Sequence, residues 1–180
     1  PAGVQVRVLA EGSEVGPIEI RGPTVITSYE SPGYEARFDK DGWLRTGDLG
    51  YFDDDGYLFI MGRDDDVINR GGEKIYPLEI EEILATVEGV SRVAVVARDD
   101  EVFGHVPVAF VQPRADLPRS ASELARLVGR VREKSGEYLS PTRRPTSVSV
   151  VETLPAHATG KIQNASLRRG EVTVIYEERL

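Results

Sequence analysis

The sequence predicts an α+β fold in two parts: a small β-rich subdomain joined by a hinge to a compact α+β domain with a three-stranded sheet and flanking helices. In residues 1–61, alternating apolar and polar residues separated by Gly and Pro turns are typical of strands. Beyond residue 66, short apolar runs alternate with apolar residues at helical spacing. Between the parts lies an acidic turn, residues 62–66, and the double glycine Gly71-Gly72 follows closely. This arrangement is typical of a chain in which one domain moves against another.

Composition restricts the class of protein. With 180 residues, the chain can form one medium domain or two small ones with a buried core. A net charge of −8 argues against a nucleic-acid groove or an anionic membrane surface as the main partner, although local positive charge can still bind small anions. The absence of cysteine excludes disulfides, thiolate metal sites and a Cys nucleophile.

The distribution of apolar residues also indicates a soluble protein. No apolar run approaches the roughly 18 residues of a membrane span, and no signal peptide opens the chain. We therefore expect a cytoplasmic protein, whose oligomeric state the sequence leaves open. Pro1-Ala2-Gly3 leads directly into a strand-like segment without an initiator Met, so we expect a piece of a longer protein.

The first part is read as strands separated by turns. Residues 4–8 alternate as a half-buried strand does, and residues 18–20 begin another. Ser31-Pro32-Gly33 is a turn signal. An Asp-Gly turn at residues 53–56 joins two aromatic-rich runs and predicts a hairpin. The aspartates of this turn invite a calcium site, but the EF-hand spacing and its closing Glu are missing, which favours a solvated turn.

The second part alternates helices and buried strands. A proline at the first helical position and a serine N-cap mark the starts of the two longer helices. The predicted elements are a helix over 77–87, strands over 93–97 and 106–111, a helix from Ser120 or Ser122, a strand over 148–151, a short helix over 163–169 and a charged tail over 171–180.

Two residues of the first part are candidates for binding a nucleotide ribose. Asp48 follows Gly47 at what we interpret as a strand-to-turn junction, where a carboxylate can accept two hydroxyl hydrogen bonds. Arg63 follows a strand and can reach a ribose or a phosphate. The structural alternatives are a turn-capping Asp and an Arg paired with the neighbouring aspartates.

Lys161 is the candidate for phosphate chemistry. It follows Thr159-Gly160 in a Pro-led loop, where a long cationic side chain can deliver charge to an anionic transition state. The alternative is an ordinary surface lysine. His157 is interpreted as a loop residue, and His105 lies beside a strand, so a metal-binding histidine pair has little support.

Taken in order, these segments resemble the C-terminal part of AMP-forming acyl-CoA synthetases, which are acid:CoA ligases of the adenylate-forming superfamily. The resemblance extends to about Arg169. Four segments carry it: GWLRTGDLGYFDDDGYL at 42–58, GRDDDVINRGGEKIYPLEIEEIL at 62–84, VAVVA at 93–97 and LPAHATGKI at 154–162.

The resemblance implies a reaction in two steps. A carboxylic acid and ATP give an acyl-adenylate and pyrophosphate, and the thiol of coenzyme A then gives the thioester and AMP. By match to the family, Asp48 would bind the ribose hydroxyls with help from Arg63, and Lys161 would be the adenylation lysine. Asp65 falls at the position about which the C-terminal domain rotates. Gly71-Gly72 would line the pantetheine tunnel.

The resemblance also implies what lies outside these residues. The phosphate loop, the magnesium-binding glutamate and the acyl pocket of the family are not in this chain, so the Mg²⁺ ligand is expected in an N-terminal region and no metal site here. The expected layout is a distal N-terminal subdomain (1–61), a hinge (62–66), a mobile lid (67–170) and a tail (171–180). Where the family often has Arg-Thr, this chain has Ala156-His157. We expect these residues alone not to catalyse adenylation.

Two other functions stay open. The chain could belong to an adenylation domain that loads a carrier protein, or to a luciferase-like enzyme; INRGGEKIYPLEIE at 68–81 looks like the CoA ligases instead. A stand-alone, non-catalytic interaction module derived from the lid is the alternative outside enzymes. The sequence does not indicate which acid is the substrate, because the residues that would shape the acyl pocket are absent.

Overall fold

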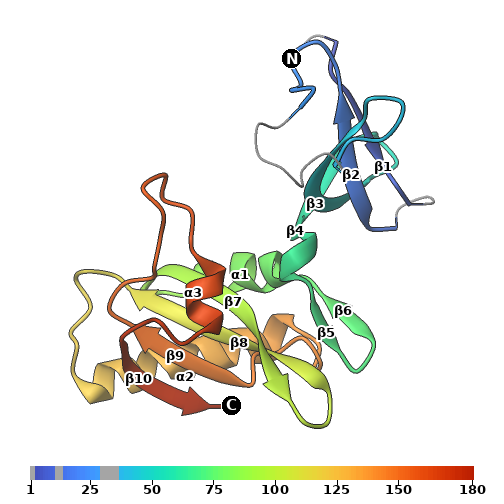
Figure 1. The fold of residues 1–180 in the computed structure, drawn as a ribbon. Coiled ribbons are helices and arrows are strands. Elements are labelled where there is room, and N and C mark those ends of the chain that lie inside the picture. The colour runs from blue at the N-terminus through green and yellow to red at the C-terminus, as the bar shows by residue number, and fades with distance from the viewer. Residues whose placement is uncertain (1–2, 11–13, 29–36) are drawn as a thin grey trace. The chain divides into compact units, whose positions relative to one another are not determined.

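The computed structural model describes residues 3–10, 14–28 and 37–180, and it divides into two compact units, Pro1–Asp65 and Asp66–Leu180 (Figure 1). The turn signal at residues 31–33 lies outside the described residues. Each unit has its own sheet, and all α-helices of the described chain lie in the second unit. The α+β class is confirmed. In the described part of the chain, no helix is long and apolar enough to cross a membrane.

Unit 1 is built on an antiparallel sheet. Its described strands follow the chain order β1-β2-β3-β4. Their bounds are Gln5–Val8 (β1), Gly16–Arg21 (β2), Leu44–Phe52 (β3) and Leu58–Arg63 (β4). The acidic segment between β3 and β4 is a turn closed by Asp53, whose Oδ1 accepts from the N–H groups of Asp55 and Tyr57 at 3.1 and 2.8 Å. This agrees with a solvated turn.

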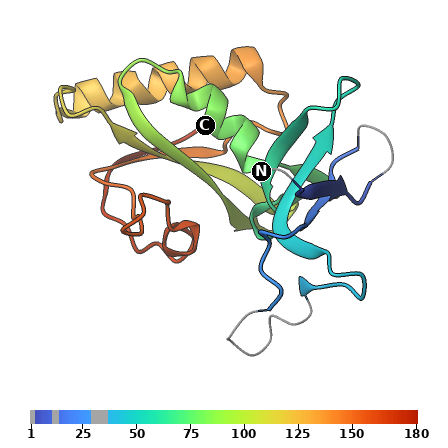
Figure 2. The same cartoon turned by 90° about the horizontal axis from the view of Figure 1, so that it is seen from above.

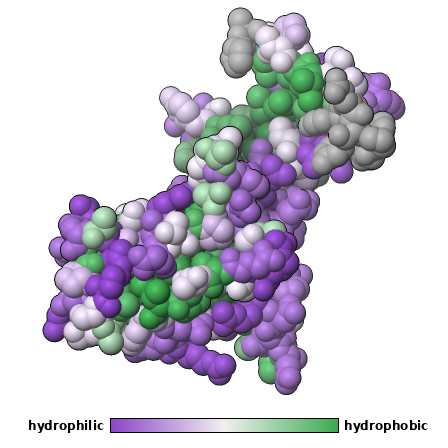
Figure 3. Space-filling model, turned by 60° about the vertical axis from the view of Figure 1, so that its left-hand side comes forward, coloured by the Kyte–Doolittle hydropathy of each residue, from purple (hydrophilic) through white to green (hydrophobic). Residues whose placement is uncertain are grey.

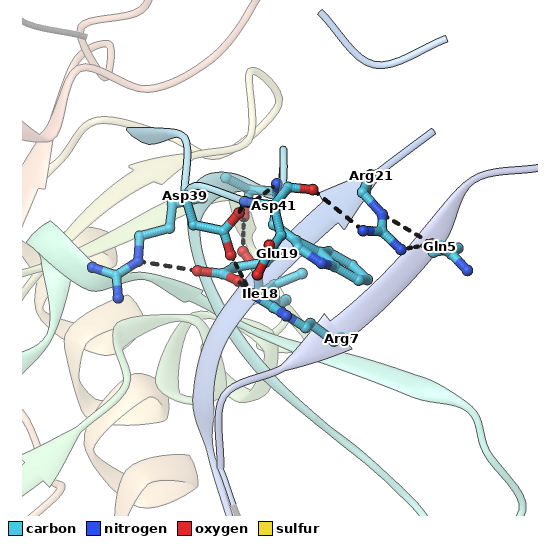
Figure 4. A network of polar contacts seen from close by, with 10 residues as sticks. Gln5, Arg7, Ile18, Glu19, Arg21, Asp39 and Asp41 are labelled. Atoms are coloured by element: carbon cyan, nitrogen blue, oxygen red, sulfur yellow. Dashed lines mark hydrogen bonds and ion pairs between the residues drawn. The ribbon is translucent and has the colours of Figure 1, made fainter. Parts of the chain in front are cut away.

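A buried carboxylate ties three strands of unit 1 together. Glu19 on β2 is only 2% exposed and lies opposite Arg7 on β1 and Arg45 on β3 in the strand register. Arg7 Nε donates to Glu19 Oε2 at 2.8 Å, and Arg45 Nε to Oε1 at 3.2 Å (Figure 4). Arg7 Nη2 also reaches Asp39 Oδ2 at 2.7 Å. A buried carboxylate of this kind requires charged donors, because its desolvation is otherwise unfavourable.

Trp43 packs against this network. The guanidinium carbons of Arg7 and Arg21 lie 4.2 and 4.7 Å from the centre of its ring. Its backbone N–H donates to Asp39 Oδ1 at 2.9 Å. Because Trp43 is the only tryptophan of the chain, its fluorescence reports on unit 1 alone.

Unit 2, all of whose residues are described, contains a six-stranded sheet and not the three-stranded sheet that the sequence predicted. Strand order is β10-β9-β8-β5-β6, with β7 paired to β8. The strands are Ile68–Arg70 (β5), Glu73–Ile75 (β6), Val90–Asp100 (β7), Gly104–Pro113 (β8), Ser147–Val151 (β9) and Val174–Arg179 (β10). The predicted strands are β7, β8 and β9; β5 and β6 were too short to be predicted from periodicity.

The sixth strand corrects the expected tail. Residues 174–179 form β10, which pairs antiparallel with β9. The sequence did not predict this strand, because its apolar run is short and two charged residues, Glu177 and Glu178, follow it directly. In the structure Glu177 accepts from Ser149 Oγ at 2.8 Å, Glu178 pairs with Arg132 of α2, and Tyr176 packs against the core.

Helices cover both faces of this sheet. The helices are Pro77–Ala85 (α1), Ala121–Tyr138 (α2) and Asn164–Arg168 (α3), and α1 and α2 lie on the opposite side from the α3 segment (Figure 2). Side chains alternate along β7: Val93 and Val95 join the cluster under α1 and α2, while Ala94 and Val96 join the cluster under α3. The central strands are therefore buried on both faces, which explains their continuous apolar runs.

A carboxylate of α1 supports the central strand. Glu81 Oε1 accepts from the backbone N–H of Val95 at 2.8 Å. Burial raises the pKa of Glu81, the Val95 N–H lowers it, and the nearby carboxylates of Asp66 and Glu82 raise it further, with a net upward shift. Charged Glu81 is therefore an unfavourable element of the folded unit at neutral pH.

We predict that Arg7→Met destabilises unit 1 clearly more than the control below, because it removes two donors from the buried Glu19 carboxylate. Chemical denaturation followed by Trp43 fluorescence measures this loss. Arg21→Met is the matched control: it also removes a guanidinium from the Trp43 ring, but Arg21 makes no contact with Glu19, so a loss below about 1 kcal/mol is expected. Equal losses in the two variants would contradict the role of the Glu19 network.

We predict that Glu81→Gln makes unit 2 more stable at neutral pH. A raised pKa means that the folded state holds the proton more tightly, so Glu81 contributes stability below its unfolded pKa of about 4.3, which is lost as pH rises through the folded pKa. Gln keeps an acceptor for the Val95 N–H without a charge. The free-energy difference between variant and wild type, measured by denaturation, should grow from about pH 4 to pH 8; a pH-independent difference would refute it.

Candidate functional site

The predicted ribose-binding residues of unit 1 form a cross-strand pair. Asp48 and Arg63 are register partners on β3 and β4, and Arg63 Nε lies 3.5 Å from Asp48 Oδ1. Asp48 lies within β3 and not at a strand-to-turn junction. Its backbone N–H donates to Thr46 Oγ1 at 3.0 Å, and the Thr46 hydroxyl donates to the Ile18 carbonyl at 3.1 Å. About a third of each paired side chain is exposed, so a ligand can reach both.

Gly47 makes room for the arginine of this pair. Its φ is +82°, and a Cβ built there would lie 2.9 Å from Arg63 Nη2. The guanidinium therefore rests against bare backbone, which only glycine leaves open without strain. The sequence showed the glycine next to Asp48, but its contact with a residue on another strand had no local signal.

Lys161 lies in a hydrogen-bonded loop between β9 and α3. The N–H of His157 donates to the carbonyl of Lys161 at 2.8 Å, and the N–H of Gly160 donates to the carbonyl of His157, also at 2.8 Å. Ala156 and Ile162 form an isolated antiparallel bridge across the loop. Gly160 has a φ of +83° at the turn, so the loop depends on this glycine. The loop is thus more ordered by its own hydrogen bonds than its sequence suggested.

The loop is also held from outside. Arg92 of β7 donates from Nη2 to the Gly160 carbonyl at 2.7 Å, next to Lys161 in the chain. Ile162 packs against the hydrophobic cluster on the α3 side of the sheet. Lys161 itself is exposed, and its Nζ makes no hydrogen bond or ion pair within the described residues. The backbone that carries this ammonium group is held in place, and the group has no partner in the described part of the chain, so it is available to an anionic ligand.

Gly71 and Gly72 are the two turn residues of the β5–β6 hairpin. Both have positive φ, +58° and +92°, as a two-residue type I′ turn requires. Gly71 N–H donates to the Phe103 carbonyl at 2.8 Å, and Gly72 N–H to Asn69 Oδ1 at 3.0 Å. A Cβ on Gly72 would meet nothing within 4 Å, so its outer side is open. A two-residue Gly-Gly turn was a hairpin signal that the sequence interpretation missed.

The expected hinge coincides with a short 3₁₀ helix, Asp64–Asp66. Asp65 is the last residue of unit 1, and Asp66 is the first of unit 2. Asp66 accepts from Asn164 Nδ2 at 3.2 Å and pairs with Arg168, so it is bound to α3 within unit 2. The role of Asp65 as a pivot remains a prediction.

The loop before α3, which carries Lys161, and the β5–β6 hairpin, which carries the glycine pair, lie at different places of unit 2 (Figure 1). Both are attached to the β7–β8 hairpin, Gly71 at its tip through Phe103 and the Lys161 loop near the other end through Arg92. At roughly 3.4 Å per residue, the strand from Arg92 to Asp100 extends over roughly 25 Å. The two groups therefore do not form one site within unit 2.

Neither histidine takes part in a metal cluster. His105 Nε2 lies 3.5 Å from Asp99 Oδ1, and His157 is exposed in the Lys161 loop. Among residues 3–10, 14–28 and 37–180, no group of three or more His, Cys, Asp or Glu side chains could hold a metal ion. The described residues therefore offer no set of ligands for a divalent ion such as Mg²⁺.

These features define a class of protein. Residues 79–161, ending at Lys161, match the family described as AMP-binding enzyme C-terminal domain. The resemblance to the C-terminal part of AMP-forming CoA ligases, inferred from the sequence motifs, is confirmed by this match and by the relatives below.

The relatives include several CoA ligases. A 2-succinylbenzoate–CoA ligase of Listeria monocytogenes is 40% identical over 155 residues, which are 85% of this chain and 31% of that protein. The o-succinylbenzoate CoA synthetase of Bacillus subtilis, solved with its acyl-adenylate intermediate, has a TM-score of 0.78 at 33% identity, with 93% of this chain and 34% of that chain covered. An anthranilate CoA ligase solved with anthranoyl-AMP has a TM-score of 0.83 at 28% identity, covering 94% and 33%. The chain thus spans about a third of the length of these relatives.

Proposed function

We propose that this chain is the C-terminal part of an AMP-forming acid:CoA ligase. The complete enzyme joins a carboxylic acid to the α-phosphate of ATP, releasing pyrophosphate, and then transfers the acyl group to the thiol of coenzyme A, releasing AMP. The observation that carries the proposal is Lys161: an exposed ammonium, without a hydrogen bond or ion pair to any described residue, on a braced loop at the end of the AMP-binding C-terminal match. ATP, CoA and the acid are substrates, and Mg²⁺ would supply phosphate charge neutralisation from ligands elsewhere in the enzyme.

Lys161 suits the first half-reaction. Attack of a carboxylate on the α-phosphorus brings two anions together, and an ammonium near both lowers that repulsion in the transition state. The side chain is long and unbranched, so the braced loop sets where its base lies while the ammonium adapts to the phosphate. In the second half-reaction the thiol attacks the acyl carbon and AMP leaves without a new bond to phosphorus, so we assign Lys161 no part in that step.

Asp48 and Arg63 suit the nucleotide ribose. The Asp48 carboxylate can accept from two vicinal hydroxyl groups, and Arg63 beside it can donate to a ribose oxygen. Thr46 fixes the backbone at Asp48, so the carboxylate is presented in one direction. The pair lies on strands and not on a loop, which favours precise placement of a ligand.

Gly71-Gly72 and Asp65 suit the second half-reaction. The open outer side of the glycine turn lets an extended thiol arm pass close to backbone. Since Lys161 and this turn lie at distant parts of unit 2, one centre can use them only in succession. Rotation of unit 2 about Asp65 would present first one and then the other. Carrier-loading or luciferase-like activity is the alternative, and the CoA ligases among the relatives favour CoA as the acceptor.

Unit 1 has the surface expected of part of a larger domain. Several large apolar side chains reach its surface, and hydrophobic residues gather over this unit in Figure 3. They include Val6, Leu9, Ile26, Tyr57, Phe59 and Ile60. Exposed apolar patches commonly mark protein contacts. We propose that an upstream part of the ligase, which carries the phosphate loop and acyl pocket, covers them.

We predict that Lys161→Ala in the complete enzyme lowers the rate of acyl-adenylate formation by 100-fold or more, in line with the roughly 10²–10³-fold loss when one transition-state donor is removed. ATP–pyrophosphate exchange measures this step. Thioester formation from chemically prepared acyl-adenylate and CoA should stay within about threefold of wild type. Lys134→Ala, an α2 lysine whose ammonium lies over Tyr138, is the matched control and should leave both steps unchanged. A Lys161→Ala enzyme with full exchange activity would remove the basis of the proposal.

We predict that Asp65→Pro impairs one half-reaction far more than the other. Proline fixes φ at about −65° and restricts the preceding residue, so rotation about position 65 is hindered and one orientation is trapped. The two half-reactions are measured separately, as above. Asp65→Ala keeps backbone freedom and serves as the control. Equal loss of both steps in the proline variant would mean that the segment is only a linker.

A further inference from the structure

The first residue of unit 2 is tied to the helix that follows the lysine loop. Asp66 Oδ1 accepts from Arg168 Nη2, and Asp66 Oδ2 accepts from Asn164 Nδ2 at 3.2 Å. These partners are 102 and 98 residues away in sequence. They occupy the first and last positions of α3, one turn apart, so the carboxylate holds the whole helix by both ends.

α3 cannot hold this position by itself. It has five residues, its N-cap Gln163 makes no side-chain capping hydrogen bond, and helices this short are not stable in isolation. On its inner side, Leu167 is 2% exposed and packs with Ala94 and Val96 of β7. On its outer side, the tie to Asp66 fixes the position of the helix along the sheet. Burial of one leucine sets the depth of α3, and the Asp66 tie sets its direction.

The position of α3 sets one end of the lysine loop. Only Ile162 and Gln163 separate Lys161 from the first residue of α3. On the other side of Lys161, Arg92 holds the carbonyl of Gly160, the residue immediately before it. The base of the Lys161 side chain is therefore fixed between Arg92 on one side and the α3–Asp66 tie on the other.

We propose that Asp66 is a positioning residue for Lys161: through Arg168 and Asn164 it couples the segment at the hinge directly to the loop that carries the adenylation lysine. This inference rests on the proposed function. When unit 2 rotates about Asp65, the next residue, Asp66, is already bound to α3, which places Lys161. The lysine loop therefore moves together with Asp66 as one body.

The strength of the tie favours positioning over stability. The side chains of Asp66 and Arg168 are 24% and 34% exposed, and ion pairs that water reaches contribute modestly to folding. The effect of the tie on the adenylation rate is larger than its effect on stability, because a shift of about 1 Å in a catalytic group can lower a rate by about 10²-fold. A similar surface pair, Arg169–Glu171, lies at the end of the same helix but has no link to Asp66.

The test uses the complete ligase with Asp66→Ala, Arg168→Met and the double variant, and Arg169→Met as the matched control. Pyrophosphate exchange measures adenylation, thioester formation from prepared acyl-adenylate measures the second step, and thermal unfolding measures stability. We expect the exchange kcat to fall 10- to 100-fold in each single variant and by no more in the double variant. Thioester formation, the KM for ATP and the control should stay within about threefold of wild type.

Three results would overturn the inference. They are unchanged exchange in Asp66→Ala and Arg168→Met, parallel loss of both half-reactions, or an equal loss in Arg169→Met. If Asp66→Ala fails to fold, the result for Arg168→Met alone decides whether the inference stands. Failure of the proposed function looks different: the wild-type enzyme would show no exchange, or Lys161→Ala would retain it.

Discussion

Pairing of β7 with β8 is the interaction on which unit 2 depends. The two long strands bury side chains on both faces, and each proposed functional element is attached to this hairpin. Its tip holds the glycine turn through the Phe103 carbonyl, its other end holds the lysine loop through Arg92, and its middle receives Glu81 from α1. Because a strand pair packed on both faces is rigid, the distance between the two functional ends is fixed.

This fixed distance gives a physical reason for a two-step use of the unit. A site that needs Lys161 for charge and a bare-backbone turn for a thiol arm cannot bring both to one centre by bending the hairpin. Moving the whole unit is the lower-energy solution, because it changes backbone dihedrals at one joint and leaves every buried contact of unit 2 in place. The joint that we propose lies where the two compact units meet, between Asp65 and Asp66. The proposed Asp66 tie would make the lysine loop part of the moving body from its first residue.

Whether a feature could be predicted from the sequence depends on how far apart in the chain its interacting residues lie. Continuous apolar runs predicted β7, β8 and β9, and capping residues predicted α1 and α2, since these signals are local. The Asp48–Arg63 register, the Gly47–Arg63 contact and the Arg92 brace join residues on separate elements, and no local pattern encodes them. β10 was missed because its glutamates find partners only after folding, in Ser149 and Arg132. The family resemblance indicated roles for Lys161 and Asp65, but it did not indicate which residues hold them in place.

Unit 1 solves the placement of its site in a different way. Its described hydrophobic core is thin, with only Ile18, Leu44 and Leu49 buried, so apolar packing alone specifies strand register weakly. The buried Glu19 carboxylate adds that specificity, because a one-residue slip of β1 or β3 would move Arg7 or Arg45 to the other face and remove one of the two arginines that pair with it. Arg45 lies on the same strand as Asp48, three residues earlier. The Glu19 network therefore fixes β3, the strand that carries Asp48, against β1 and β2, and the separate pairing of β3 with β4 places Arg63 opposite Asp48.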